Sequence, residues 1–97
     1  MIDRMQSFQT FAAGVLAEVI RRQPASPART TFAWSVAAGP VMARAATVEV
    51  RNDTLLVTPK DARWSREIER SRETLLQRVQ ELLGRDAVAT ITICEKP

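Results

Sequence analysis

The pattern of apolar and polar positions is clearest between residues 52 and 68, where a short strand leads into a helix. The apolar run of Leu55, Leu56 and Val57 follows the turn-forming pair Asn52 and Asp53. Further on, apolar side chains recur at spacings of three, four and seven, which is typical of one helix face; they are Trp64, Ile68, Leu75, Val79 and Leu82. The pattern predicts a strand over 54–58 and one long helix that ends at Gly84, with Leu55, Val57, Trp64 and Ile68 in the core.

Two residues compete as the N-cap of this long helix. Thr58 as the cap puts Pro59 at the first helical position and Asp61 at the third, which resembles a capping box. Asp61 can instead be the cap itself. We take Thr58 as the first interpretation and Asp61 as the alternative.

Residues 2–22 carry an amphipathic pattern that predicts an N-terminal helix, and the prolines of the following QPASPA segment end it. Two roles are open for this helix. It can cover the core as a lid, or it can act as a detachable arm that binds a partner. The lid is favoured, because a chain of 97 residues has little apolar area to spare.

The remaining elements follow from shorter patterns. Residues 29–38 predict a helix with Phe32, Trp34 and Val36 turned inward, which ends at Gly39 before Pro40. Alternation over 46–51 predicts a half-buried strand that forms an antiparallel hairpin with 54–58. Alternation over 87–94 predicts a third strand, with Val88 on the face of the threonines.

These elements occur in the order helix, helix, strand, strand, helix, strand. Each helix has one apolar stripe and each strand one apolar face, so the economical arrangement is an α+β fold in which the helices pack on one face of a three-stranded sheet. We expect a single domain over 1–97, made of an N-terminal helix (1–23) and a core (29–94). Within that core, Trp34 and Gly39 are expected to have structural roles.

The composition argues against an enzyme. The chain has no histidine, no glycine-rich phosphate loop and no cluster with metal-ligand spacing, so we expect no catalytic residue, cofactor, metal or small-molecule substrate. No apolar run is long enough to span a membrane, and the N-terminus lacks the pattern of a signal peptide. We therefore expect a cytoplasmic protein.

The basic residues suggest a binding role instead. Twelve of the 14 are arginines, a bias that suits phosphate or acidic partners but also follows from a GC-rich genome. Six cations near the hairpin and the start of the long helix are candidates for one nucleic-acid-binding surface: Arg44, Arg51, Lys60, Arg63, Arg66 and Arg70. Neighbouring carboxylates can neutralise it. Trp64 can stack on a base, although its place on the apolar stripe favours the core.

The run FAWSVAAGPVMARAATVEVRNDTLLVTPKDARWSREI resembles the bacterial DciA family. The matching features are Trp34, Val36, the Gly39-Pro40 pair, an aliphatic hairpin, and Trp64 followed by Glu67 and Ile68; the resemblance covers about residues 10–94. It implies a fold similar to a truncated type II KH domain. It also implies a non-enzymatic DNA-replication accessory protein that binds the DnaB-type replicative helicase and DNA and assists helicase loading.

Two alternatives stay open. The first is a KH-like RNA-binding module, although the chain lacks the GxxG loop with which KH domains hold a nucleic-acid backbone. The second is a protein-interaction adaptor that binds no nucleic acid, which predicts an uncharged or acidic sheet surface.

Overall fold

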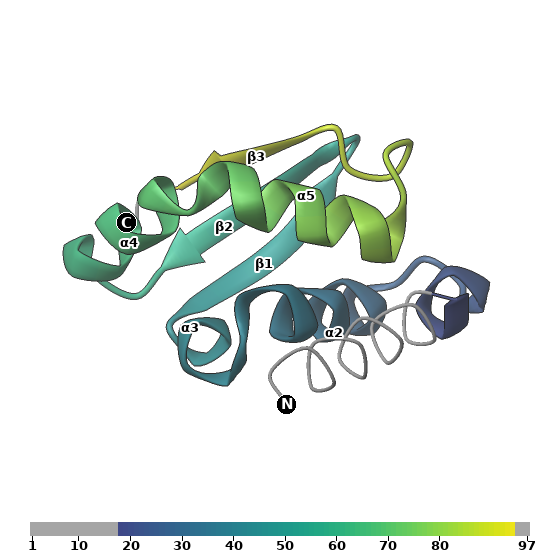
Figure 1. The fold of residues 1–97 in the computed structure, drawn as a ribbon, viewed down its shortest axis with the longest axis horizontal. Coiled ribbons are helices and arrows are strands. Elements are labelled where there is room, and N and C mark those ends of the chain that lie inside the picture. Colours follow the sequence, from purple (N-terminus) through teal and green to yellow (C-terminus); the bar gives the residue numbers. More distant parts are fainter. Residues whose placement is uncertain (1–17, 95–97) are drawn as a thin grey trace, which may run out of the picture.

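The computed structural model describes residues 18–94, in which the expected α+β fold is confirmed (Figure 1). Residues 18–22 are helical and precede the first labelled helix. The elements that follow are α2 (Pro27–Ala38), α3 (Pro40–Arg44), β1 (Ala46–Arg51), β2 (Thr54–Pro59), α4 (Ala62–Arg70), α5 (Arg72–Leu83) and β3 (Thr90–Ile93). The predicted order of elements is kept, with one short extra helix, α3, and with the long helix divided in two.

The sheet has the strand order β1-β2-β3, so β2 is central and the other two strands form the edges. β1 and β2 pair antiparallel as predicted, with Arg51 opposite Thr54 on either side of a two-residue turn. Asn52 in that turn has φ +59°, a left-handed conformation that asparagine tolerates better than most residues. β3 pairs parallel with β2, and Leu55 is opposite Ile91.

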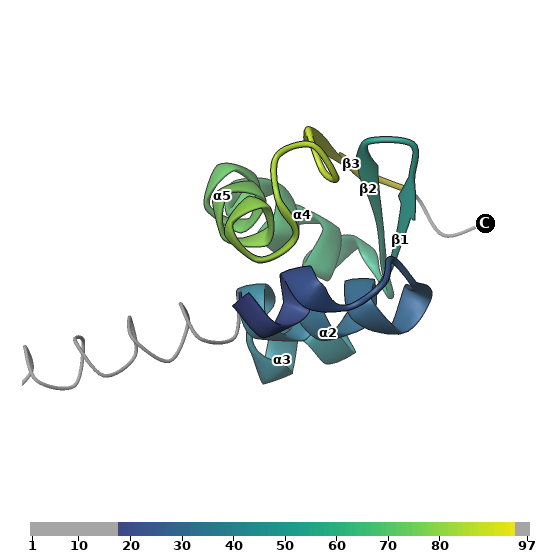
Figure 2. The same ribbon diagram turned by 90° about the vertical axis from the view of Figure 1, so that its right-hand side faces the viewer.

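The labelled helices lie on one side of the sheet, as the end-on view shows (Figure 2). They cover the side chains at the even positions of β1 and the odd positions of β2 and β3, where Leu55, Val57 and Ile91 are buried. The core continues between α2 and α5, with Trp34 only 2% exposed. The opposite face of the sheet is rich in threonine: Thr47, Thr54, Thr58, Thr90 and Thr92.

α2 begins two residues earlier than predicted, because Ser26 caps it and Pro27 takes the first helical position. The Oγ atom of Ser26 accepts a hydrogen bond of 3.1 Å from the backbone amide of Arg29. Gly39 ends the helix with φ +85°, as the sequence predicts. Phe32 was expected to point inward, and this prediction is wrong: its side chain is 49% exposed.

Asp61, the alternative candidate, is the N-cap of α4. Asp61 lies two residues beyond the end of β2, and its Oδ1 atom accepts a hydrogen bond of 2.9 Å from the amide of Trp64. The interpretation with Thr58 as the cap is therefore wrong. The reason is that Thr58 and Pro59 continue the pairing with β1, and this pairing keeps them extended.

The predicted single long helix breaks at Ser71, whose φ and ψ of −99° and 8° leave the helical range. The apolar stripe still continues across the break, and Ile68, Leu75, Val79 and Leu82 are all buried. Gly84 ends α5 with φ +95°, as predicted. The spacing of apolar residues does not reveal the break, because Ile68 and Leu75 on either side of it are seven residues apart and so lie on the same helix face.

β3 is shorter than the predicted strand over 87–94. The chain turns through residues 85–87 before it pairs, so Val88 is buried instead of sharing the face of the threonines. Ala89 then joins the sheet edge through a hydrogen bond of 2.7 Å from its amide to the carbonyl oxygen of Asp53.

The predicted N-terminal helix over 2–22 lies mostly outside the described residues. In its described part, Ile20 is buried and belongs to the core cluster, whereas Val19 is 49% exposed. Among the helices of residues 18–94, none is long and apolar enough to cross a membrane.

Candidate nucleic-acid interface

Two of the predicted cations meet where the hairpin strands begin and end. Arg44 is the last residue of α3 and Lys60 follows β2, and the amide of Lys60 donates a hydrogen bond of 2.8 Å to the carbonyl oxygen of Ala45. Both side chains are exposed and line a shallow hollow of about 140 Å³. The Nε atom of Arg44 donates to the carbonyl oxygen of Pro40 at 3.1 Å. This end of the hairpin, opposite the turn, is called the open end below.

The first turns of α4 bring two more cations to the open end. Arg63 and Arg66 are exposed and lie three residues apart, which places them on neighbouring positions of one helix face. Arg70 continues this face, but its Nη1 atom lies 3.5 Å from Oε1 of Glu67. The carboxylate of Glu67 therefore partly offsets the positive charge that Arg70 presents to a ligand.

Arg51 does not belong to this surface. It ends β1 beside the hairpin turn, so the length of the strand, about 17 Å, separates it from the open end. Its Nη2 atom also lies 2.9 Å from Oε1 of Glu49 on the threonine-rich face. The prediction of one surface made of six cations is therefore wrong, because Arg44 and Arg51 stand at opposite ends of the same strand.

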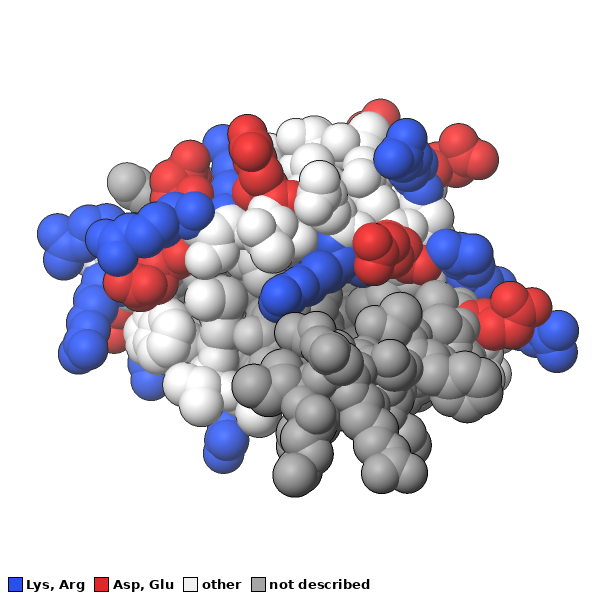
Figure 3. Space-filling model, viewed as in Figure 1, with Lys and Arg blue, Asp and Glu red and all other residues white. Residues whose placement is uncertain are grey.

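Four cations remain as the open-end cluster: Arg44, Lys60, Arg63 and Arg66. Within residues 18–94, none of the four forms an ion pair with a carboxylate. Figure 3 shows basic side chains gathered on the left, over α4, with acidic side chains among them. Asp61, the N-cap of α4, adds one carboxylate between Lys60 and Arg63 in the sequence. The cluster presents donors suited to phosphate oxygens.

The burial of the predicted structural residues divides into two groups. Trp34, Leu55, Val57 and Ile68 are buried in the core cluster. Gly39 is half-buried at the α2–α3 junction, where it supplies the positive φ.

The prediction that Trp64 is a core residue is wrong. It is half-buried and lies outside the core cluster. It lies in the first turn of α4, directly after Arg63 in the sequence, and part of its side chain is exposed at the open end.

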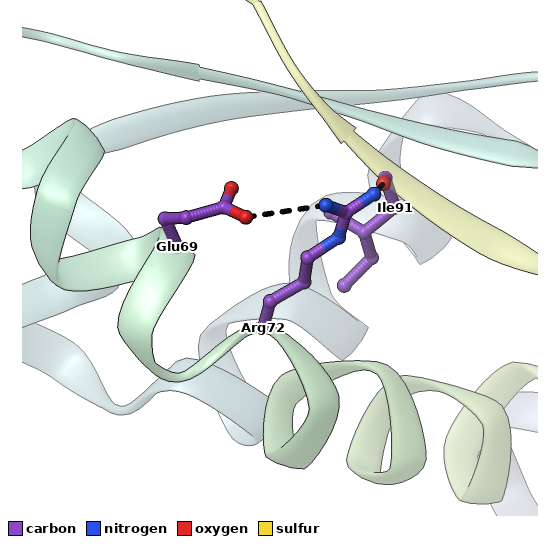
Figure 4. A network of polar contacts seen from close by, with 3 residues as sticks. All are labelled: Glu69, Arg72 and Ile91. Carbon is purple, nitrogen blue, oxygen red and sulfur yellow. Dashed lines mark hydrogen bonds and ion pairs between the residues drawn. The ribbon is translucent and has the colours of Figure 1, made fainter.

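Sequence reasoning missed the role of Arg72. Its guanidinium lies between two acceptors: Nη1 is 3.2 Å from Oε1 of Glu69, and Nη2 donates to the carbonyl oxygen of Ile91 at 2.7 Å (Figure 4). One signal was available, since Arg72 stands four residues after Ile68 and three before Leu75, on the apolar stripe. A cation at such a position reaches a buried acceptor or ends the stripe.

The described residues bring together no group of three or more acidic, histidine or cysteine side chains that could hold a metal ion. The open-end cluster is a cationic surface whose chemistry is attraction and hydrogen bonding to anions. Contacts of this kind position a nucleic-acid backbone without reading its sequence.

The fold defines a small α+β domain whose exposed cations gather at one end of a hairpin. A family model described as "Dna[CI] antecedent, DciA" matches residues 8–93, and the chain belongs to this family. Membership indicates a role in loading the DnaB-type replicative helicase during DNA replication, and with it an interaction with that helicase. Comparisons with curated proteins and with solved structures found no match. The expected likeness to a truncated type II KH domain therefore stays a prediction.

Proposed function

We propose that this protein is a non-enzymatic accessory factor of helicase loading that contacts DNA phosphates through the open-end cluster while it binds the replicative helicase. The observation that carries the DNA contact is the set of four exposed cations that have no ion-pair partner within residues 18–94. Family membership supports the helicase contact. A role in replication supports the further proposal that the protein acts in the cytoplasm, where a bacterial chromosome is copied.

The proposed DNA contact is weak and independent of sequence. Four phosphate contacts on a single strand predict that log K falls with log salt with a slope of about −3, from about −0.7 for each contact. A backbone contact of this kind lets the domain stay near the strand while the helicase closes around it.

The test uses the whole chain and two readouts. Purified DnaB-type helicase from the same organism is captured on the immobilised protein, and a fluorescent single-stranded oligonucleotide is titrated across a salt series. We expect capture of the helicase and a salt slope near −3. A slope near zero would contradict the proposed DNA contact. Failure to capture the helicase would contradict the proposed accessory role.

One observation favours a second function, a protein-interaction adaptor without nucleic acid. Among residues 18–94, the charged side chains on the threonine-rich sheet face are Glu49 and Arg51, and these form an ion pair at 2.9 Å. Over this part of the chain the face has no net charge, as the adaptor hypothesis predicts. Helicase capture combined with a flat salt slope would favour this second function over the first.

A further inference from the structure

The outer edge of β1 has backbone groups that the sheet does not use. Arg51 is opposite Thr54 across the two-residue turn, and the amide of Lys60 donates a hydrogen bond to the carbonyl oxygen of Ala45. The backbone amides and carbonyls of the odd residues of β1 therefore bond to β2. The amides and carbonyls of Val48 and Val50 therefore point away from the sheet. Within residues 18–94, they make no hydrogen bond to another element.

A crevice of about 380 Å³ opens beside this edge. Val48 and Val50 line one side, the first turn of α2 lines the other, and Leu83 with Ala87 form apolar surface within it. The lining is mostly apolar, and its volume is in the range of sites that hold small ligands or large side chains. The crevice and the unused backbone groups thus lie at the same stretch of β1.

Arg29 adds a charge that no carboxylate among residues 18–94 pairs with. Within the same residues its Nε atom is shielded from solvent and has no hydrogen-bond partner, although Nη1 donates to the carbonyl oxygen of Gln23 at 3.0 Å. Arg29 lines the crevice, and the first turn of α2 contains no acidic residue that could compensate the helix dipole. A carboxylate is the group that matches this corner of the crevice.

The other edge of the sheet differs. The amide of Cys94 donates a hydrogen bond to the carbonyl oxygen of Val57, so the backbone groups of the even residues in and after β3 face β2. The carbonyl oxygen of Ile91, an odd residue, therefore points outward from the sheet. Arg72 occupies this carbonyl with a hydrogen bond of 2.7 Å. β3 is also two residues shorter than β1. An added strand thus finds more unused backbone at β1 than at β3.

We infer that the edge of β1 from Val48 to Val50 binds an extended segment of a partner protein as a fourth strand. The segment bonds to the outward amides and carbonyls, and one apolar side chain enters the crevice. An acidic residue two positions away lies on the same face of the segment and pairs with Arg29. The site is at the turn end of the hairpin, so it is independent of the open-end cluster and of the proposed DNA contact.

The test starts from a random-peptide phage library selected on the whole chain. We expect selected peptides to share an apolar residue and an acidic residue two positions apart. The synthesised peptides should shift the NMR signals of the Val48 and Val50 amides. Methylation of alternate peptide nitrogens should abolish binding, while methylation of the intervening ones should not, and this scan leaves the protein unchanged.

A matched pair of variants tests the acidic residue. Arg29→Gln should weaken binding about tenfold, the expected effect of losing one charge-assisted contact. Arg22→Gln removes an arginine whose exposed pair with Glu18 lies outside the crevice, and it should leave binding unchanged. Equal effects of the two variants would overturn the role of Arg29.

Three results would overturn the inference as a whole. One is a selection that enriches no peptide, and another is a set of NMR shifts that maps to α3 or α4 instead of β1. The third is a dimer of the chain alone, seen by analytical ultracentrifugation, in which the Val48 and Val50 amides are protected from exchange, because the occupant would then be a second copy.

Discussion

Arg72 and Ile91 are joined by a hydrogen bond of 2.7 Å, from Nη2 of the guanidinium to the carbonyl oxygen, across 19 positions of the sequence. The bond connects the first residue of α5 to the edge strand β3, at its buried residue Ile91. Because α5 begins immediately after the break at Ser71, this contact fixes the direction in which the second half of the broken helix leaves the first.

We therefore expect Arg72→Met to lower the free energy of unfolding by about 1 kcal/mol, less than a buried hydrogen bond from a charged donor contributes, since the side chain is 43% exposed. Methionine keeps the apolar stem and removes the donors. Urea denaturation measures the change. The control is Arg70→Met, whose exposed pair with Glu67 should contribute less than about 0.5 kcal/mol. Equal losses would show that the Ile91 contact adds no stability.

The cap of α4 supports a second prediction. Asp61→Ala removes the acceptor of the Trp64 amide and should cost about 1 kcal/mol of unfolding free energy, whereas Asp61→Asn keeps an acceptor and should cost less. Thermal and urea denaturation compare these variants with Thr58→Ala. A larger loss in Thr58→Ala than in Asp61→Ala would restore Thr58 as the residue that starts the helix.

Much of the fold was predictable because local patterns and tertiary packing agree. The predicted boundaries of β1, the turn at Asn52 and the helix end at Gly84 all match the structure. Each depends on a short-range rule: alternation, a turn pair, or a glycine with positive φ. The start of α4 was misassigned because strand pairing with β1 holds Thr58 extended, and local spacing cannot report that pairing.

The binding surface was less predictable, for a geometric reason. Sequence proximity placed Arg44 and Arg51 near the same hairpin, but a strand has two ends and the residues stand at different ones. The roles of Arg72 and Arg29 depend on contacts with distant or unpaired groups, which no spacing rule encodes. Helical periodicity placed Trp64 on the buried stripe, although the first turn of a helix can extend past the core.

The open-end cluster predicts how the salt dependence changes on mutation. Neutralising Arg63 and Arg66 together should reduce the magnitude of the slope of log K against log salt by about 1.4, or two contacts at about 0.7 each on single strands. Fluorescence anisotropy across a salt series measures this. Neutralising Arg51 and Arg85 removes the same charge away from the cluster and is the control. If both double variants change the slope equally, net charge and not the cluster governs binding.

Gly84 supplies a prediction about backbone conformation. A Cβ atom at this position would meet nothing within 4 Å, so the cost of Gly84→Ala arises from φ +95° alone. We expect a loss of about 1 to 2 kcal/mol in the free energy of unfolding. Gly84→Asn should lose less, because asparagine tolerates positive φ better than alanine does. Equal losses for the two variants would point to a steric cause instead.

The two tryptophans should respond differently to DNA. Trp34 is 2% exposed, whereas Trp64 is half-buried beside Arg63, and the chain has no other tryptophan. In Trp34→Phe the remaining emission reports Trp64, and we expect an oligonucleotide to quench it, because bases stack on aromatic surface near bound phosphates. In Trp64→Phe the buried Trp34 should keep its intensity. Binding that is detected by anisotropy without quenching in Trp34→Phe would show that the cations hold the strand without help from Trp64.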